Sequence, residues 1–210
     1  MSCELDVHVL CLPGLSEDIV RARRDSIDAA VRDAGYKVNI YEVDGIAGHL
    51  GKSRYKGYSH GDAEYCTYVD HDDMVREDAF KSLLPYLDAG VPCITTGEVH
   101  LFPDGSTREY PRLQHHLSVV RRDMLQSLEY KDYRFYPDQF ILSRFTPQHI
   151  PECVYVHRLW NDSFSRRQRE NDKKSAAIEW RRISSNKLFM AEALTREEID
   201  RAIQEELDNG

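Results

Sequence analysis

The chain has 210 residues, a formal net charge of −8 and 41% hydrophobic residues. That length suffices for one well-filled core, so we expect a single α/β domain with some appended structure. The negative charge argues against wrapping of nucleic acid over the whole surface, although it permits a local basic patch. Five scattered cysteines without a C-x-x-C pair favour reduced thiols over a zinc site or a disulfide framework.

No segment approaches the ~20 apolar residues that a membrane span requires. The first residues also lack the basic region and the long apolar run of a signal peptide. We therefore expect a soluble protein of the cytoplasm.

The first half of the chain alternates strand-like and helical patterns. An apolar run at 7–12 predicts a buried strand, and apolar positions spaced i, i+3, i+4 and i+7 then predict a helix that ends at Gly35. Alternation at 37–43 predicts a second strand, which makes a β-α-β unit with a parallel pair and a right-handed crossover. A short helix at 53–59 and a strand at 65–69 follow.

Three acidic residues come directly after the strand at 65–69. A strand that ends in Asp70 and Asp72 points both carboxylates to one side of the sheet, where they can share a hard cation that carries phosphate oxygens. The alternative is that the acids cap the next helix, expected at 76–89, and Asp73 alone can do that. Paired carboxylates repel unless something stabilises them, so a binding site is favoured for Asp70 and Asp72.

Other residues at strand ends are expected beside these acids. Ligands in open α/β sheets bind at the carboxyl ends of the strands. Pro13, Asp44 and the acids at 70–73 all follow predicted strands, so we expect them along one edge of the sheet.

The second half of the chain has weaker patterns. We expect a strand, a hairpin, a short helix and a last strand, at 92–96, around Asp104-Gly105, at 123–128 and at 154–156. Pro137 suits the first turn of a helix and places Asp138 at its amino end. A basic stretch with little apolar periodicity runs from Arg166 to Arg182, and a capping box at 195–198 predicts a terminal helix.

Four motifs stand in a fixed order along the chain. A helix with Arg54, Gly57 and Gly61 precedes the strand that ends in Asp70-His71-Asp72-Asp73. The other motifs are Val43-Asp44-Gly45, the run Pro137-Asp138-Gln139-Phe140-Ile141-Leu142-Ser143-Arg144, and Val156-His157-Arg158 with Ser163-Phe164-Ser165. No single motif is specific, but their order and spacing over 7–165 are hard to obtain by chance.

In this order the motifs resemble the inverting family-2 type of glycosyltransferase with the GT-A fold. The family's patterns are A-R-N-x-G-x-x-x-A-x-G before D-x-D-D, and later E-D-x-x-L-x-x-R. Two positions depart from these patterns, because Pro137 replaces the glutamate and Tyr55 replaces the asparagine. The chain is also shorter than many members of the family, which leaves little material for an acceptor domain.

The resemblance implies a fold and an activity. The fold is a GT-A (Rossmann-like) α/β domain at 1–165, with a mostly parallel central sheet flanked by helices, and a basic segment with a short C-terminal helix at 166–210. The activity is metal-dependent transfer of a hexose or pentose from a nucleotide-diphosphate donor to an acceptor hydroxyl, with inversion. Mn²⁺ or Mg²⁺ is the implied cofactor.

The resemblance also assigns residues to roles. Asp138 is the implied catalytic base, although a carboxylate at a helix amino end is also stabilised by the helix dipole alone. The implied metal ligands are Asp72, Asp70 and His157, and a histidine ligand favours Mn²⁺ over Mg²⁺. The implied donor-binding residues are Pro13, Asp44, Arg54, Asp70 and Arg158. For His157 and Arg54 a simple surface role is the alternative.

The sequence leaves alternatives for the acceptor substrate and for the class of function. The basic residues Arg166, Arg167, Arg169, Lys173 and Lys174 suit a polyanionic acceptor such as a nucleic acid, a nucleotide or a lipid head group, or they form a solvated tail. The rival functions are a non-catalytic nucleotide- or sugar-binding module and a sugar-phosphate nucleotidyltransferase, although the acidic loop at 12–18 argues against the latter. Trp160 suits stacking on a sugar or burial in the core, and the pair His115-His116 is expected to be structural.

Overall fold

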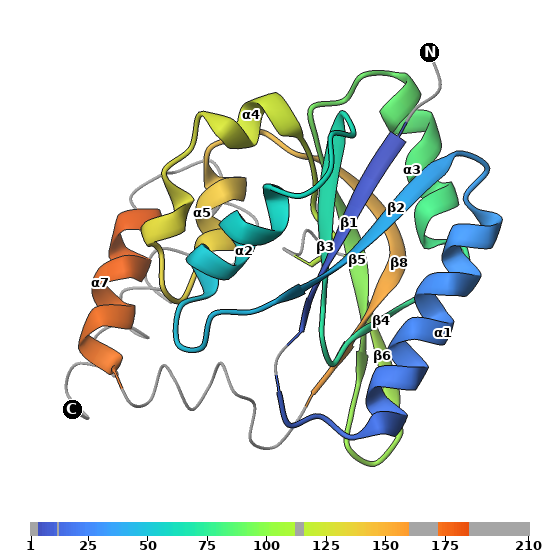
Figure 1. Cartoon of the computed structure of the whole chain (residues 1–210), viewed down its shortest axis with the longest axis horizontal. Helices are drawn as coiled ribbons and strands as arrows, with labels where there is room; N and C mark the ends of the chain where they lie inside the picture. Colours follow the sequence, from blue (N-terminus) through green and yellow to red (C-terminus); the bar gives the residue numbers. More distant parts are fainter. Residues whose placement is uncertain (1–3, 12, 112–115, 160–171, 185–210) are drawn as a thin grey trace.

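The computed structural model describes residues 4–11, 13–111, 116–159 and 172–184. They form one eight-stranded mixed sheet with helices on both of its faces (Figure 1). The strand order is β2-β1-β3-β7-β5-β8-β4, and β6 pairs with β5 outside this path. The expectation of an α/β domain is therefore confirmed. Among the described residues, no helix has both the length and the apolar composition to cross a bilayer.

The β-α-β unit predicted in the first half is present. Strand β1 (Glu4–Cys11), helix α1 (Glu17–Asp33) and strand β2 (Lys37–Asp44) follow in order, and β1 pairs in parallel with β2 and with β3 (Tyr65–Asp70). The register places Cys11 opposite Asp44 and Leu10 opposite Asp70. The carboxyl ends of the three strands therefore coincide, at the lower edge of the sheet in Figure 1.

The other half of the sheet contains more antiparallel pairing than the sequence indicates. Its strands are β4 (Met74–Val75), β5 (Cys93–Leu101), β6 (Thr107–Tyr110), β7 (Val119–Arg121) and β8 (Gln148–Arg158). Only β5 and β8 pair in parallel there, and the hairpin expected around Asp104-Gly105 joins β5 to β6. Strand β8 is much longer than the segment expected at 154–156. The expectation was too short because Pro151 and the irregular pairing with β5 at Gly97 interrupt the regular alternation of the strand.

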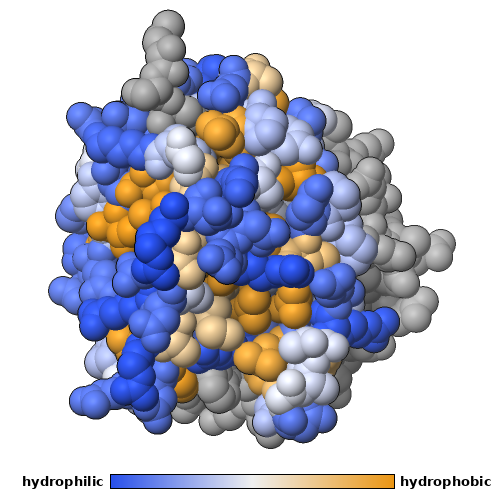
Figure 2. All heavy atoms as spheres, turned by 90° about the vertical axis from the view of Figure 1, so that its right-hand side faces the viewer, coloured by the Kyte–Doolittle hydropathy of each residue, from blue (hydrophilic) through white to orange (hydrophobic). Residues whose placement is uncertain are grey.

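Helices cover the two faces of the sheet. The other helices within the described residues are α2 (Leu50–Tyr58), α3 (Ala79–Asp88), α4 (Arg122–Gln126), the 3₁₀ turn η1 (Tyr130–Asp132), α5 (Pro137–Ser143) and α7 (Lys173–Ser184). In Figure 1, α1 and α3 lie on one face, and α2, α4, α5 and α7 lie on the other. The outer surface on the side of α1 and α3 is mainly hydrophilic, with scattered apolar patches (Figure 2).

Each layer has its own core. On the face of α1 and α3, Ile27, Phe80 and Leu83 pack on the buried side chains of β1 and β3. On the opposite face, aromatic residues dominate, and Tyr68 and Phe140 are among them. This second core lies beneath the helices that carry Arg54 and Asp138, so it fixes the positions of both.

One alternative from the sequence is excluded. Helix α3 begins at Ala79 after an N-cap at Asp78, so Asp73 does not cap it. Part of the basic stretch, 173–184, is a helix that buries Ala176 and Ile183. Trp160, the motif at 163–165, the predicted domain boundary at 165, the residues Arg166, Arg167 and Arg169, and the capping box at 195–198 lie outside the described residues.

The amino end of α2 leaves no room for a side chain at Gly51. Its N–H donates to the carbonyl oxygen of Tyr133 at 2.8 Å, and an added Cβ meets the backbone oxygens of Tyr133 and Tyr130. We expect Gly51→Ala to lower the free energy of unfolding by about 3 kcal/mol or more, because the backbone atoms that clash with the new methyl group cannot rotate away as a side chain can.

Gly105→Ala is the control, since φ is +82° there and the space is open. It should cost only the ~1–2 kcal/mol of left-handed strain. Equal urea midpoints for the two variants contradict this account.

Candidate active site

A buried arginine joins two carboxylates that are far apart in the sequence. Arg54 on α2 is 2% exposed, and its guanidinium forms a bidentate pair with Asp138, Nε to Oδ1 at 2.9 Å and Nη2 to Oδ2 at 3.1 Å. Nη2 also lies 2.8 Å from Oδ1 of Asp70. The guanidinium carbon sits 3.3 Å from the centre of the Tyr68 ring. We call Asp70, Arg54 and Asp138 the carboxylate bridge.

The local sequence places each member of the carboxylate bridge. Asp70 ends β3 at the edge where ligands bind in open sheets. Asp138 lies in the first turn of α5, which Pro137 begins, so the helix dipole favours its charged form. Arg54 faces the sheet because α2 packs closely on β1, where an added Cβ at Gly57 meets the His8 side chain at 3.3 Å.

The two carboxyl groups have opposite pKa shifts. Burial acts to raise the pKa of Asp70, but Arg54, His116 and His71 outweigh it and lower that pKa to about 2. Burial raises the pKa of Asp138, and the Arg54 guanidinium only partly opposes this effect. Enzyme active sites typically contain two neighbouring titratable groups whose environments shift their pKa values in opposite directions, so that one acts as an acid or base and the other stays ionised.

A second group lies on the same side of the fold. One ligand atom each of Asp73, His116 and His157 lies within 4.8 Å of the others, and we call these three residues the Asp-His-His group. Asp73 is 1% exposed and accepts hydrogen bonds from the Tyr155 hydroxyl at 2.7 Å and from the Arg158 backbone N–H at 2.8 Å. Nδ1 of His157 lies 3.0 Å from Oδ2 of Asp73.

His116 is held by a buried carboxylate. Its Nδ1 lies 2.6 Å from Oε1 of Glu98, and its ring stacks on the rings of Tyr155 and His157 at centroid distances of 5.0 and 4.5 Å. Burial acts to lower the pKa of His116, but Glu98 outweighs it and raises that pKa to about 9. Nε2 is 4.0 Å from Oδ2 of Asp70, so His116 connects the Asp-His-His group to the carboxylate bridge.

The Asp-His-His group has the composition of a divalent metal site. One carboxylate and two imidazoles form a mixed oxygen and nitrogen donor set, which Mn²⁺ accepts more readily than Mg²⁺. The bond from His116 to Glu98 is the outer contact that orients a ligating histidine and fixes its tautomer. The residues therefore fit the cofactor that the sequence implies.

The predicted metal ligands are only partly brought together. His157 belongs to the Asp-His-His group, whereas Asp70 is paired with Arg54. Asp72 lies 3.8 Å from Nδ1 of His71 and is 23% exposed. Burial and the neighbouring Asp73 raise the pKa of Asp72.

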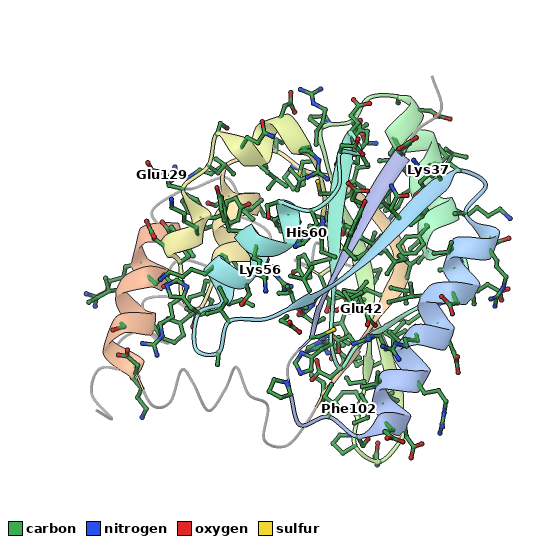
Figure 3. The ribbon with its side chains drawn as sticks, in the orientation of Figure 1. Lys37, Glu42, Lys56, His60, Phe102 and Glu129 are labelled. Carbon is green, nitrogen blue, oxygen red and sulfur yellow. The ribbon has the colours of Figure 1, made fainter. Side chains whose placement is uncertain are left out.

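Of the predicted donor-binding residues, Pro13, Asp44 and Asp70 lie at the expected strand ends. Pro13 is exposed just after β1, and Asp44 is exposed at the end of β2. Lys56 extends from α2 (Figure 3), and its Nζ donates to the Asp44 carbonyl oxygen at 3.0 Å. Glu42 lies on β2 (Figure 3). Its carboxylate accepts from Arg24 and from the buried Arg23 of α1. Nη1 of Arg23 also donates to the His71 carbonyl oxygen at 3.3 Å, and this hydrogen bond ties α1 to the turn at 70–73.

Several residues of the site were missed from the sequence. Glu98 and His116 are eighteen positions apart and meet only because β5 lies beside the segment before β7. His116, which was expected to be structural, therefore has a buried carboxylate partner and lies at the candidate site. Nothing in the spacing of Tyr68 and Tyr155 separates them from the other tyrosines of the sequence.

Comparison with known proteins agrees with this geometry. The sequence profile of glycosyl transferase family 2 matches residues 24–148, more than half of the chain. The protein therefore belongs to glycosyl transferase family 2, and it is a glycosyltransferase. A search of curated proteins returns no match.

Solved structures show the same fold. The chain is similar to S. aureus TarS 1–349, with a TM-score of 0.60 and 12% identity over 97% of this chain and 70% of that one. The structures of TarS 1–349 with UDP-GlcNAc and with UDP match with TM-scores of 0.60 and 0.59, both at 12% identity. They cover 99% and 100% of this chain and 72% and 71% of theirs. At this identity the similarity shows the GT-A fold alone.

Proposed function

We propose that this glycosyltransferase moves a sugar from a uridine-diphosphate sugar to an acceptor hydroxyl, with inversion at the anomeric carbon and with a divalent cation at the sheet edge. The observation that carries the proposal is the carboxylate bridge beside the Asp-His-His group, at the edge where GT-A folds bind ligands. The complexes of S. aureus TarS with UDP and with UDP-GlcNAc support a uridine donor.

Asp138 acts as the base in this proposal. One of its oxygens takes the proton of the acceptor hydroxyl while the acceptor oxygen bonds to the anomeric carbon. The bond from that carbon to the diphosphate oxygen breaks, and its electron pair leaves with UDP. The raised pKa of Asp138 favours proton acceptance, and each oxygen keeps a lone pair beyond the one that Arg54 occupies.

Arg54 and the Asp-His-His group have supporting roles. Arg54 orients the Asp138 carboxylate through two parallel hydrogen bonds and keeps the Asp70 carboxyl ionised. Asp73, His116 and His157 are the residues that would hold the cation, with Asp72 as a predicted further ligand. A bound divalent cation neutralises charge that develops on the departing diphosphate.

Thermal unfolding with nucleotide sugars tests the proposal. UDP-GlcNAc and a panel of other nucleotide sugars are added with and without Mn²⁺, and UDP release is measured in parallel. A ligand at about 100 times its Kd stabilises the folded state by about 2.7 kcal/mol, so a donor should raise Tm, and more so with Mn²⁺. The proposal fails if no uridine-diphosphate sugar raises Tm or releases UDP under either condition.

Glu98 offers a test of the metal site that needs no substrate. Calorimetric titration of Glu98→Gln with Mn²⁺ should show an affinity about 10–100-fold weaker than that of the parent, because the contact that orients His116 is weakened. Glu42→Gln is the matched control and should leave the Mn²⁺ affinity unchanged, since the Glu42 carboxylate also holds its partners, Arg23 and Arg24, but is not bonded to the Asp-His-His group.

Two aspartate variants distinguish the possible ligand sets. Asp73→Asn should remove Mn²⁺ binding if the Asp-His-His group holds the ion. Asp72→Asn should remove it if the ion lies where the sequence resemblance places it. Binding that survives both substitutions contradicts a metal site at this edge.

A further inference from the structure

Helix α7 reaches the site through one buried carboxylate. Glu179 is 9% exposed and accepts three consecutive backbone N–H groups. Oε2 accepts from Arg134 at 2.8 Å, and Oε1 accepts from Phe135 at 2.8 Å and from Tyr136 at 2.7 Å. Figure 1 shows α7 beside η1 and α5, the elements that flank this turn.

The turn that Glu179 holds leads directly into the base of the proposed function. Tyr136 is the N-cap residue of α5, and no side-chain hydrogen bond of its own caps the helix. Asp138 follows two residues later, in the first turn. A carboxylate that accepts N–H groups forms charge-assisted bonds, which are stronger than those between neutral groups. Glu179 therefore fixes the backbone from which the Asp138 side chain extends.

The same turn also holds the helix that carries Arg54. The first N–H groups of α2, those of Leu50 and Gly51, donate to the carbonyl oxygens of Arg134 and Tyr133 at 3.1 and 2.8 Å. The turn thus binds α2 through its carbonyl oxygens and α7 through its N–H groups. The placement of both Arg54 and Asp138 therefore depends on this turn.

Arg134 adds a second tie at the same place. Its Nε donates to the Gly48 carbonyl oxygen at 2.7 Å, in the loop that follows β2, and its Nη1 donates to Asp172 at 2.9 Å, just before α7. The arginine therefore joins the donor edge of the sheet to the amino end of α7. Its contact with Asp172 is partly exposed, so we assign the larger effect to Glu179.

We infer that Glu179 is a positioning residue that sets the geometry of the Arg54–Asp138 pair from the C-terminal helix. The inference rests on the proposed function only where Asp138 is taken as the base. The positioning itself is a statement about distances between described residues. It also means that helix α7 (Lys173–Ser184) takes part in the transferase site rather than forming an appended tail.

The test follows the Nε–H signal of Arg54 by NMR on the full chain with ¹⁵N-labelled arginine. In the parent this proton is bonded to Asp138 and buried, so its exchange with water should be slow. Glu179→Gln retains one acceptor oxygen but places an NH₂ group against a backbone donor. We expect faster exchange of the Arg54 Nε–H with water, by tenfold or more.

Enzyme kinetics give a second measurement. For Glu179→Gln, kcat for UDP release from UDP-GlcNAc with Mn²⁺ should fall about 10–100-fold at unchanged KM, as for a misplaced catalytic group.

Ile183→Val is the matched control on the same helix. Ile183 is fully buried, so the substitution loosens the packing of α7 but leaves the Glu179 carboxylate in place. It should lower Tm without changing the exchange of the Arg54 Nε–H or kcat. The inference is overturned if Glu179→Gln leaves that exchange unchanged, or if Ile183→Val changes it equally. Failure of the parent to release UDP would count against the proposed function, while the exchange rates still decide the positioning.

Discussion

Arg54→Gln is expected to lower the free energy of unfolding by about 3–5 kcal/mol at pH 7, because it leaves two carboxylates at a buried site without their cation. The Arg54 side chain is 1% exposed and that of Asp138 is 4% exposed, so water screens their interaction poorly. Asp70 is 25% exposed, which moderates its share. Urea unfolding of the parent and the variant measures the difference.

The pH dependence of this loss has a definite sign. In the parent, the pKa of Asp70 is lowered from 3.8 to about 2, so the stability from this group is present above pH 4 and is lost as pH falls towards 2. Without Arg54 the two carboxylates repel, and the pKa of Asp138, already raised in the parent, rises further. A raised pKa contributes stability at low pH that is lost as pH rises. The difference between variant and parent should therefore shrink from pH 7 to pH 5.

Two further variants separate this effect from a general loss of an ion pair. Arg121→Gln removes an exposed pair with Asp123 and should cost no more than about 1 kcal/mol. Arg54→Gln combined with Asp138→Asn removes one of the repelling charges, so it should recover part of the stability that the single variant loses. A double variant no more stable than Arg54→Gln would contradict the assigned repulsion.

The sequence predicts the parallel half of the fold well because the signals there are local. Periodicity over a few residues indicates β1, α1 and β2, and the right-handed crossover then places Asp44 and Asp70 at one edge. The order of the motifs adds Arg54 and Asp138 to the same site. The structure joins these two residues by a direct ion pair across 84 positions, a pairing that no local pattern carries.

The part of the site that was missed depends on strand register. Asp73 looks like a helix cap in the sequence, but β4 pairs with β8 and brings it to Tyr155 and His157. His116 has no signal of its own, because its partner Glu98 lies on a neighbouring strand. The strand register in a mixed sheet is set by long-range packing, so such contacts cannot be predicted from a single sequence. The same holds for Glu179, whose three donors lie more than forty positions upstream.

Asp138→Asn should remove sugar transfer while donor binding remains. An amide does not take the acceptor proton, so the rate should fall about 10²–10⁴-fold, the usual contribution of a positioned base. Arg54 keeps its contact with Asp70, so the fold should survive with a loss of about 1–3 kcal/mol. UDP release from UDP-GlcNAc with Mn²⁺ gives the rate, and calorimetry gives the donor affinity.

The control for this variant is Asp123→Asn, another aspartate paired with an arginine but 65% exposed and away from the carboxylate bridge. It should change neither rate nor affinity. The pH profile adds a second criterion, because a base works only when deprotonated and burial raises the pKa of Asp138. The parent rate should therefore fall as pH drops through that raised pKa, and the residual rate of Asp138→Asn should not follow the same curve. An Asp138→Asn rate within a few-fold of the parent would exclude this carboxylate as the base and leave Arg54 with a purely structural partner.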